Sequence, residues 1–375
     1  MSLFITCGSD LENLLIEELH ELGIKKTAVG FRGVYVQDTS MDTIYRINYC
    51  SRIAGRVLFP LARFICHDQK GLYHGASKVD WNRYIPKGKT FAIDANVHHK
   101  NLRNSLFAAQ VVKDAICDQI RDLRGSRPDV DVQEPDIQLN LFIHNGQTIL
   151  SFDTSGQPLH KRGYRLDAGE APLQESLAAA LLRLAKYTGE EVLLDPCCGS
   201  GTFLTEAALI ATRTPPGYLR KNWGFMNHPD FNLQQWLKVK NTADDNRRLM
   251  AKQKIWGCDK DAHMVHVCKL NLRAAGVQQY VELVQSDFRE FTPIVQPNFL
   301  ITNPPHGKRL DNVLILAPLY RALGEFMKHK MAKPSKGFVF VGNLELTKEV
   351  GLAPKQRHVI NSSGIDSRLL EFEIY

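Results

Sequence analysis

The 375-residue sequence lacks the features that mark membrane and secreted proteins. It has no run of about 18 apolar residues, the minimum for a membrane-spanning helix. Its first residues, MSLFITCGSD, do not place a basic segment before an apolar one, as a secretion signal would. The eight cysteines are scattered and include no Cys-x-x-Cys pair. We therefore expect reduced thiols, a cytoplasmic setting and no membrane partner.

A metal-binding pattern is also missing. Cys258, His263, His266 and Cys268 lie within eleven residues, but their spacing is not that of a structural zinc site. The segment around them reads as the end of a strand followed by a helix with an apolar stripe. We expect no bound metal.

A surplus of positive charge is present. The 47 lysines and arginines outnumber the 40 acidic residues, which gives a net charge of +7. Such a surplus favours a polyanionic partner without requiring one. No heptad seam is visible, so we expect a monomer.

Residues 1–60 predict a small α+β unit. Leu3–Thr6 and Phe31–Val36 read as strands. A helix with leucines on one face ends at Gly23, and a second helix covers about residues 40–50.

Residues 61–155 predict a second α+β unit. Phe91–Ala95 alternates like a strand, and Asn104 or Ser105 can cap a helix. The dipeptide Asn145-Gly146 is a strong hairpin signal between two strands. These strands are 136–143 and 148–153, and the buried face of the helix is expected to include Phe107, Val111, Ala115 and Ile120.

Residues 156–171 read as a connector, and residues 172–375 alternate between helix and strand. This alternation predicts an α/β domain with a mostly parallel sheet. Segments around 357–360 and 369–375 are expected to form an antiparallel hairpin at its edge. The five earlier strands are expected at 191–194, 255–257, 281–284, 299–302 and 337–341.

The strongest local motif is EVLLDPCCGSGTFLTEAALIA, residues 191–211. Gly199 and Gly201 let the backbone approach a ligand, and Thr202 is expected to cap the following helix. A dinucleotide site would need a small residue at position 204, which is leucine, and a phosphate loop would need a lysine after Gly201. The loop amides suit a carboxylate and Asp195 suits an ammonium group. Together they suggest the amino-acid end of S-adenosylmethionine.

Two further acidic residues follow the next strands. Asp259 can accept two ribose hydroxyls, and Asp287 can accept an adenine amino group. Asp259 comes 64 positions after Asp195 (259 − 195), so residues 212–245 read as an insertion. Because parallel strands end at one edge of a sheet, all three carboxylates are expected to line one crevice.

The fourth strand ends in FLITNPPHGKR, residues 299–309. Methyl transfer to an exocyclic amine requires the lone pair of the amine to point at the methyl carbon. The side-chain oxygen of Asn303 and the carbonyl of Pro304 can bind the two amine hydrogens and orient it. Two prolines fix the backbone so that both oxygens point the same way.

These motifs resemble those of a known family. DPCCGSGTF followed by NPPHG is similar to the Rossmann-fold methyltransferases that act on exocyclic amines. The connector HKRGYRLDAGEAPLQESLAAA and the segment TFAIDANVHHKNLRNSLFAAQVVKDAI resemble RNA guanine-N2 methyltransferases with a THUMP domain. Nearly the whole chain shares this resemblance, most closely to the bacterial enzymes of large-subunit (23S) ribosomal RNA and next to those of transfer RNA.

The resemblance implies a fold, a cofactor and a set of site residues. Residues 1–60 would be a ferredoxin-like α+β unit and 61–155 a THUMP RNA-binding domain. Residues 172–375 would be a Rossmann-like methyltransferase domain with a mostly parallel seven-stranded sheet. The chemical site would comprise Asn303, Pro304, Pro305 and His306, where His306 replaces the usual aromatic residue that stacks on the target base. The S-adenosylmethionine site would comprise Pro172, Leu173, Glu175, Asp195, Pro196, Cys197, Gly199, Ser200, Gly201, Thr202, Asp259, Lys260, Asp287, Phe288 and Asn303.

Three basic clusters are candidates for contacts with structured RNA, because cations bind phosphates without reading sequence. They are His98, His99, Lys100 and Arg103; Lys161, Arg162 and Arg165; and Lys308 and Arg309. Two alternatives to RNA methylation stay open. The same motif also serves DNA or protein amine methylation, and the chain can be a non-catalytic RNA-binding assembly factor.

Overall fold

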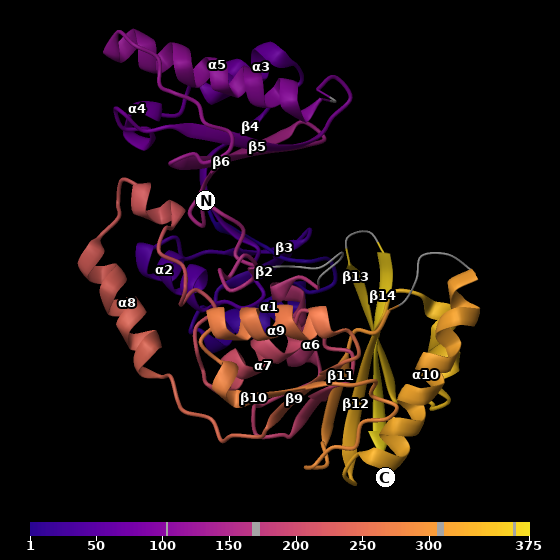
Figure 1. The fold of residues 1–375 in the computed structure, drawn as a ribbon. Helices are drawn as coiled ribbons and strands as arrows, with labels where there is room; N and C mark the ends of the chain where they lie inside the picture. Colours follow the sequence, from indigo (N-terminus) through magenta and orange to yellow (C-terminus); the bar gives the residue numbers. More distant parts are fainter. Residues whose placement is uncertain (103, 167–172, 306–310, 363–364) are drawn as a thin grey trace. The chain divides into compact units, whose positions relative to one another are not determined.

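The computed structural model describes residues 1–102, 104–166, 173–305, 311–362 and 365–375. The chain folds into two compact units, each built on one seven-stranded sheet (Figure 1). The first unit comprises residues 1–7, 18–159 and 220–241, and the second comprises residues 8–17, 160–219 and 242–375. Within the described ranges, no helix is both long enough and apolar enough to cross a membrane.

The first unit joins the two predicted N-terminal α+β units into one sheet. Its strand order is β2-β3-β1-β4-β7-β6-β5, and only the β5–β6 pair is parallel. The strands are β1 Leu3–Thr6, β2 Thr27–Gly30, β3 Gly33–Val36, β4 Arg56–Ile65, β5 Phe91–His98, β6 Ile137–His144 and β7 Gln147–Asp153. The helices before residue 160 are α1 Glu12–Glu21, which has residues in both units, α2 Met41–Cys50, α3 Gln69–Ala76, α4 Trp81–Tyr84 and α5 Ser105–Arg124.

Several local predictions for this unit are confirmed. The Asn104 side chain caps α5 by accepting hydrogen bonds from two backbone amides. Asn145 and Gly146 both have positive φ, at 49° and 84°, and join β6 to β7. Such a pair of left-handed residues matches the twist of the strands it connects.

Two local predictions were wrong. Residues 31–36 are not one strand, because Phe31 and Arg32 form the turn between β2 and β3, where Arg32 has a φ of 54°. Phe107 is 40% exposed, although Val111, Ala115 and Ile120 of the same helix are buried. Phe107 lies in the first turn of α5, on a side that faces away from the hydrophobic core, whereas the next residue, Ala108, is buried in that core.

The segment 220–241, predicted as part of an insertion into the methyltransferase domain, packs into the first unit. It contains the turn η1 Gly224–Asn227 and most of α8 Leu233–Asp245. Phe225 and Trp236 are buried against Tyr45 and Tyr49 of α2, with ring centroids 4.8 Å apart for Tyr45–Phe225 and 5.3 Å apart for Tyr49–Trp236. Buried aromatic pairs of this kind contribute strongly to a core, which explains why the segment belongs here.

The second unit has the predicted mostly parallel α/β sheet. The strand order is β10-β9-β8-β11-β12-β14-β13. The first five of these strands are parallel, and β14 pairs antiparallel with both β12 and β13. Figure 1 shows α6, α7 and α9 together on one side of this sheet and α10 on the other. The elements are α6 Glu175–Leu184, β8 Leu193–Asp195, α7 Thr202–Ala211, β9 Ile255–Asp259, α9 Ala262–Ala274, η2 Gln278–Tyr280, β10 Val281–Gln285, β11 Phe299–Thr302, α10 Asp311–Lys330, β12 Ser335–Val341, η3 Leu344–Val350, β13 Gln356–Ser362 and β14 Ile365–Ile374.

Candidate active site

The candidate site lies where β8, β9 and β11 end side by side. These three strands are parallel neighbours in the sheet, with Leu194 in register with Leu300 and Asp195 in register with Gly257. Their carboxyl ends therefore meet at one edge, which is where open α/β sheets bind ligands. Asp195, Asp259 and Asn303 come to this edge from three separate parts of the chain.

The loop between β8 and α7 has the tight geometry that its glycines predict. Gly199 and Gly201 have φ values of 50° and 81°, in the left-handed region. A side chain at Gly201 would also place its Cβ 2.3 Å from the Cys268 sulfur. Gly201 itself occupies the N-cap position of α7, so the prediction that Thr202 caps this helix was wrong. Thr202 is the first helical residue and its hydroxyl accepts a hydrogen bond from Arg165 instead.

Asp259 supports this loop. Its Oδ2 accepts a hydrogen bond from the Gly199 amide at 2.9 Å, and its Oδ1 accepts one from the Asp261 amide at 3.0 Å. The carboxylate therefore fixes the distance between the glycine loop and the start of α9. Its predicted role in binding ribose stays a prediction, as does that of the neighbouring exposed Lys260.

Asp195 is the most perturbed acid of the site. It is 2% exposed, and its Oδ1 accepts hydrogen bonds from the Thr302 hydroxyl at 2.7 Å and from the Cys197 amide at 3.1 Å. Burial raises its pKa to about 7, against the lowering effect of these two hydrogen bonds. Its Oδ2 accepts no hydrogen bond from the part of the chain that the structure describes. This oxygen is free to accept one from a ligand.

The pKa of Asp287 is shifted in the direction opposite to that of Asp195. It lies beyond the end of β10, and the Arg289 guanidinium binds its carboxylate through Nε at 2.9 Å. The hydrogen bond from Arg289 lowers the pKa of Asp287 to about 2, so the group is ionised at neutral pH. Phe288, also predicted for the cofactor site, is buried at 3% exposure and packs in the core of the sheet.

Asn303 follows the last residue of β11. Its Oδ1 is buried and accepts no hydrogen bond from any described residue. A buried acceptor without a partner costs free energy, on the order of 1–3 kcal/mol, and a bound ligand is one physical explanation for such a group. Pro304 is buried and Pro305 is exposed. His306, Lys308 and Arg309 lie outside the described residues.

Two predicted cofactor residues near the start of α6, Leu173 and Glu175, are connected to the loop through Arg165. Glu175 is buried at 4% exposure and forms an ion pair with Arg165, whose guanidinium also binds the Leu173 carbonyl. Pro172 lies outside the described residues. Pro196 and Ser200 are buried and Cys197 is half-buried in the loop. Burial raises the pKa of the Cys197 thiol, which therefore remains protonated.

The candidate RNA contacts divide into two groups. His98, Lys100 and Lys161 are exposed and His99 is half-buried, so these residues stay candidates, whereas Arg103 lies outside the described residues. Arg162 corrects the prediction. It is 2% exposed and forms a buried ion pair with Glu206 of α7 at 3.6 Å, so its guanidinium is not available to a phosphate.

Sequence reasoning missed two groups at the site. Thr302 carries a hydroxyl at the end of an otherwise apolar buried strand, FLIT. This polar residue in an apolar run was the sequence signal that could have identified it as a site residue. Asn271 lies on α9 and bridges the Leu166 amide to the Ser200 carbonyl, with both hydrogen bonds at 3.0 Å. No local motif distinguishes Asn271 from a surface residue.

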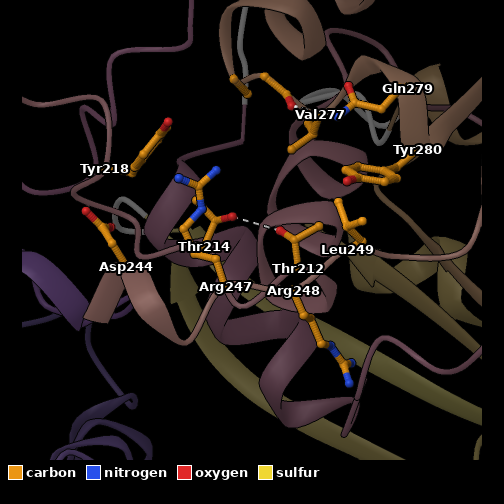
Figure 2. Close-up of a pocket in the computed structure, with 12 residues that line it drawn as sticks. Thr212, Thr214, Tyr218, Asp244, Arg247, Arg248, Leu249, Val277, Gln279 and Tyr280 are labelled. Carbon is orange, nitrogen blue, oxygen red and sulfur yellow. Dashed lines mark hydrogen bonds between the residues drawn. The ribbon is translucent and has the colours of Figure 1, made fainter. Parts of the chain in front are cut away.

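A separate pocket of about 310 Å³ lies at the other end of α7 (Figure 2). Thr212 and Thr214 form part of its lining, and the Arg247 guanidinium lies 4.0 Å from the centre of the Tyr218 ring. The ten residues of α7 span about 15 Å between this pocket and the glycine loop. The pocket is therefore not part of the cofactor site.

The sheet order, the glycine loop and the polar strand ends define a Rossmann-like methyltransferase whose cofactor is S-adenosylmethionine. The residues fit this cofactor, because the free Asp195 Oδ2 suits the ammonium group of its amino-acid end and the loop amides suit the carboxylate. Residues 162–368 match the RMKL-like methyltransferase domain, residues 66–153 the THUMP domain and residues 2–58 the RlmL ferredoxin-like domain. The chain belongs to this methyltransferase family, as its sequence motifs indicated.

Relatives and a solved structure agree with this assignment. The chain is 36% identical to a putative RNA methyltransferase of Synechocystis, over 99% of this chain and 96% of the relative. It is 35% identical to the ribosomal RNA large subunit methyltransferase K/L of Methylococcus capsulatus, over 99% of this chain but only 51% of that protein. The chain thus spans about half the length of the K/L relatives. A putative methyltransferase complexed with SAH superposes with a TM-score of 0.89 at 26% identity, covering 100% of this chain and 98% of the other.

Proposed function

We propose that the protein methylates the exocyclic N2 amine of a guanine in RNA, with 23S ribosomal RNA as its substrate. The observation that carries this proposal is the buried Oδ1 of Asn303, which has no partner among the described residues. It follows β11, one strand away from the glycine loop, and the adjacent Thr302 binds Asp195 directly. A hydrogen-bond acceptor at this position suits an amine that is brought to the cofactor.

Methyl transfer to this amine requires the protein mainly to orient the amine toward the cofactor. The bound cofactor supplies an electrophilic methyl group on a sulfonium. The Asn303 Oδ1 and the Pro304 carbonyl accept the two hydrogens of the amine, which aims its lone pair and favours pyramidal nitrogen. Positive charge develops on that nitrogen as the bond to carbon forms, and the same two oxygens stabilise it. The extra proton leaves the nitrogen after transfer, so a strong general base is not needed.

RNA is proposed as the substrate from three kinds of support. Residues 66–153 match the THUMP domain, which the resemblance gives as an RNA-binding module, and both relatives are named as RNA methyltransferases. The net charge of +7 and the exposed His98, Lys100 and Lys161 suit phosphate contacts. Guanine N2 and large-subunit RNA rest on the resemblance of the NPPHG motif and the connector to that family.

The test compares RNA from cells with and without the gene. Mass-spectrometric mapping should find one N2-methylguanosine that disappears from 23S RNA on deletion. The purified protein should restore it with labelled cofactor, whereas Asn303→Ala should lower the transfer rate by at least a hundredfold. Asn343→Ala is the matched control, because the Asn343 side chain caps η3 in the same unit.

Three outcomes would reject parts of the proposal. Label in adenine alone would reject the target atom. Label in transfer RNA but not in 23S RNA would reject the substrate, and a fully active Asn303→Ala protein would reject the assigned role of the amide oxygen.

A further inference from the structure

Arg165 was predicted as an RNA contact, but its guanidinium lies against the glycine loop. Its Nε donates to Glu175 at 2.9 Å. Its Nη2 donates to the Leu173 carbonyl at 2.9 Å and to the Thr202 hydroxyl at 3.1 Å, and its Nη1 donates to the Ser200 hydroxyl at 3.3 Å. One planar group thus connects the chain before α6 to the loop that follows β8.

These contacts leave little of the guanidinium for RNA. Four of its five N–H groups have partners, and the side chain is only 15% exposed. Withdrawing it to meet a phosphate would leave Glu175, whose side chain is 6% exposed, as a buried carboxylate without a cation. Breaking such a pair is strongly unfavourable. The contacts therefore favour a role inside the methyltransferase unit.

Ser200 shows how firmly the connector holds the loop. Arg165 donates to its hydroxyl, while the Asn271 amide donates to its carbonyl and accepts from the backbone of Leu166. Two consecutive connector residues, 165 and 166, therefore fix the same loop residue from its side chain and from its backbone. The loop conformation depends on this segment as well as on its own glycines.

The charges also match the expected ligand. The Arg165–Glu175 ion pair lies beside the N-terminus of α7, which carries a partial positive charge. The amino-acid end of the cofactor is a zwitterion with one group of each sign. Because Arg165 and Glu175 neutralise each other, they hold the loop without adding net charge beside this zwitterion.

We infer that Arg165 is a positioning residue of the cofactor site, which joins Leu173 and Glu175 to Ser200 and Thr202 and so sets affinity for S-adenosylmethionine. The inference depends on the cofactor and not on which nucleotide is methylated. The inference about Arg165 would still hold if the enzyme methylated a different base.

The test measures binding of S-adenosylhomocysteine by calorimetry, without RNA or turnover. Arg165→Ala should weaken this binding by about tenfold or more, the usual scale for loss of charge-assisted hydrogen bonds. Arg165→Lys keeps the charge but cannot bridge both segments, so binding should recover only in part. Steady-state assays should show a raised KM for the cofactor, with kcat largely kept at saturation. Affinity for purified 23S RNA should change by less than about twofold if phosphate contacts lie elsewhere.

Lys161→Ala is the matched control, since Lys161 is an exposed cation of the same connector. It should leave S-adenosylhomocysteine affinity unchanged. Unchanged binding in both Arg165 variants would overturn the inference, and so would a loss of RNA affinity without a loss of cofactor affinity. If Arg165→Ala does not fold, Arg165→Lys decides alone: wild-type affinity in that variant overturns the inference.

Discussion

Affinity for the cofactor should rise as the pH passes through about 7, because of Asp195. This carboxyl is buried, and burial raises its pKa to about 7. The ammonium end of the cofactor binds the ionised carboxylate and not the protonated acid. Binding therefore requires loss of a proton below the pKa and none above it, so affinity falls on the acid side.

The size of the effect follows from that pKa. With a pKa of about 7, roughly nine-tenths of the free protein carries ionised Asp195 at pH 8 and roughly one-tenth at pH 6. The dissociation constant for S-adenosylhomocysteine should therefore be about tenfold higher at pH 6 than at pH 8. At pH 7 about half a proton should be released for each ligand bound.

Calorimetry in buffers of different ionisation enthalpy measures both the affinity and the released proton. Thr302→Val removes the hydroxyl hydrogen bond that lowers the pKa of Asp195, so the midpoint of the affinity curve should move to higher pH. Asp195→Asn should bind more weakly and show no midpoint near 7. A flat profile from pH 6 to 8 in the wild-type protein, without proton release, would refute this account of the site.

Three further predictions concern stability, measured as the free energy of unfolding in urea. Gly201→Ala should lower the free energy of unfolding by about 1–3 kcal/mol, because Gly201 has a positive φ and its Cβ would lie 2.3 Å from the Cys268 sulfur. Adding Cys268→Ala to this variant should restore only the part of the loss that comes from the steric clash. Full stability of the Gly201→Ala single variant would contradict the reasoning. Trp236→Ala should lower the free energy of unfolding by about 3–5 kcal/mol, because it opens a cavity in the aromatic cluster of the first unit. A decrease below about 1 kcal/mol would show that this cluster does not stabilise the fold as a hydrophobic core. Arg162→Met should lower the free energy of unfolding by about 3–5 kcal/mol, because it removes the cation of the buried pair with Glu206. The double variant that also carries Glu206→Gln should recover most of that loss. An equal loss in the single and the double variant would show that the ion pair is not the cause.

Much of the fold followed from local signals in the sequence. Asn145-Gly146 forms its hairpin because both residues accept the left-handed region that a two-residue turn requires. The strand at Phe299–Thr302 was correct to the residue, since a short apolar run between polar ends has one place in a covered parallel sheet. The strand predicted for residues 31–36 began too early, because an aromatic residue such as Phe31 favours a strand when only local sequence is considered. In the structure, Phe31 and Arg32 form the turn of the hairpin between β2 and β3.

The site was less predictable because side-chain partners depend on tertiary contacts. Asp195 and Asn303 were identified because each follows a buried strand within a motif. Arg162 and Arg165 were placed in a basic cluster, which reads as solvated in a linear sequence. Their acidic partners, Glu206 and Glu175, lie 44 (206 − 162) and 10 (175 − 165) positions away on helices, where no spacing rule connects them. An arginine in a connector therefore needs a structure before it is assigned to RNA or to the protein itself.

The segment 220–241 shows why sequence order and packing give different domains. The chain enters the second unit after residue 159, returns to the first after 219 and leaves it again after 241. The apolar side chains of Trp223, Phe225 and Trp236 are buried within the first unit, so a fragment of residues 172–375 would carry them without the α2 residues that cover them. Exposed aromatic clusters of this size promote aggregation. We therefore expect a fragment of residues 172–375 to aggregate more readily than the full chain, which size-exclusion chromatography would measure, and a monomeric fragment would contradict this reasoning.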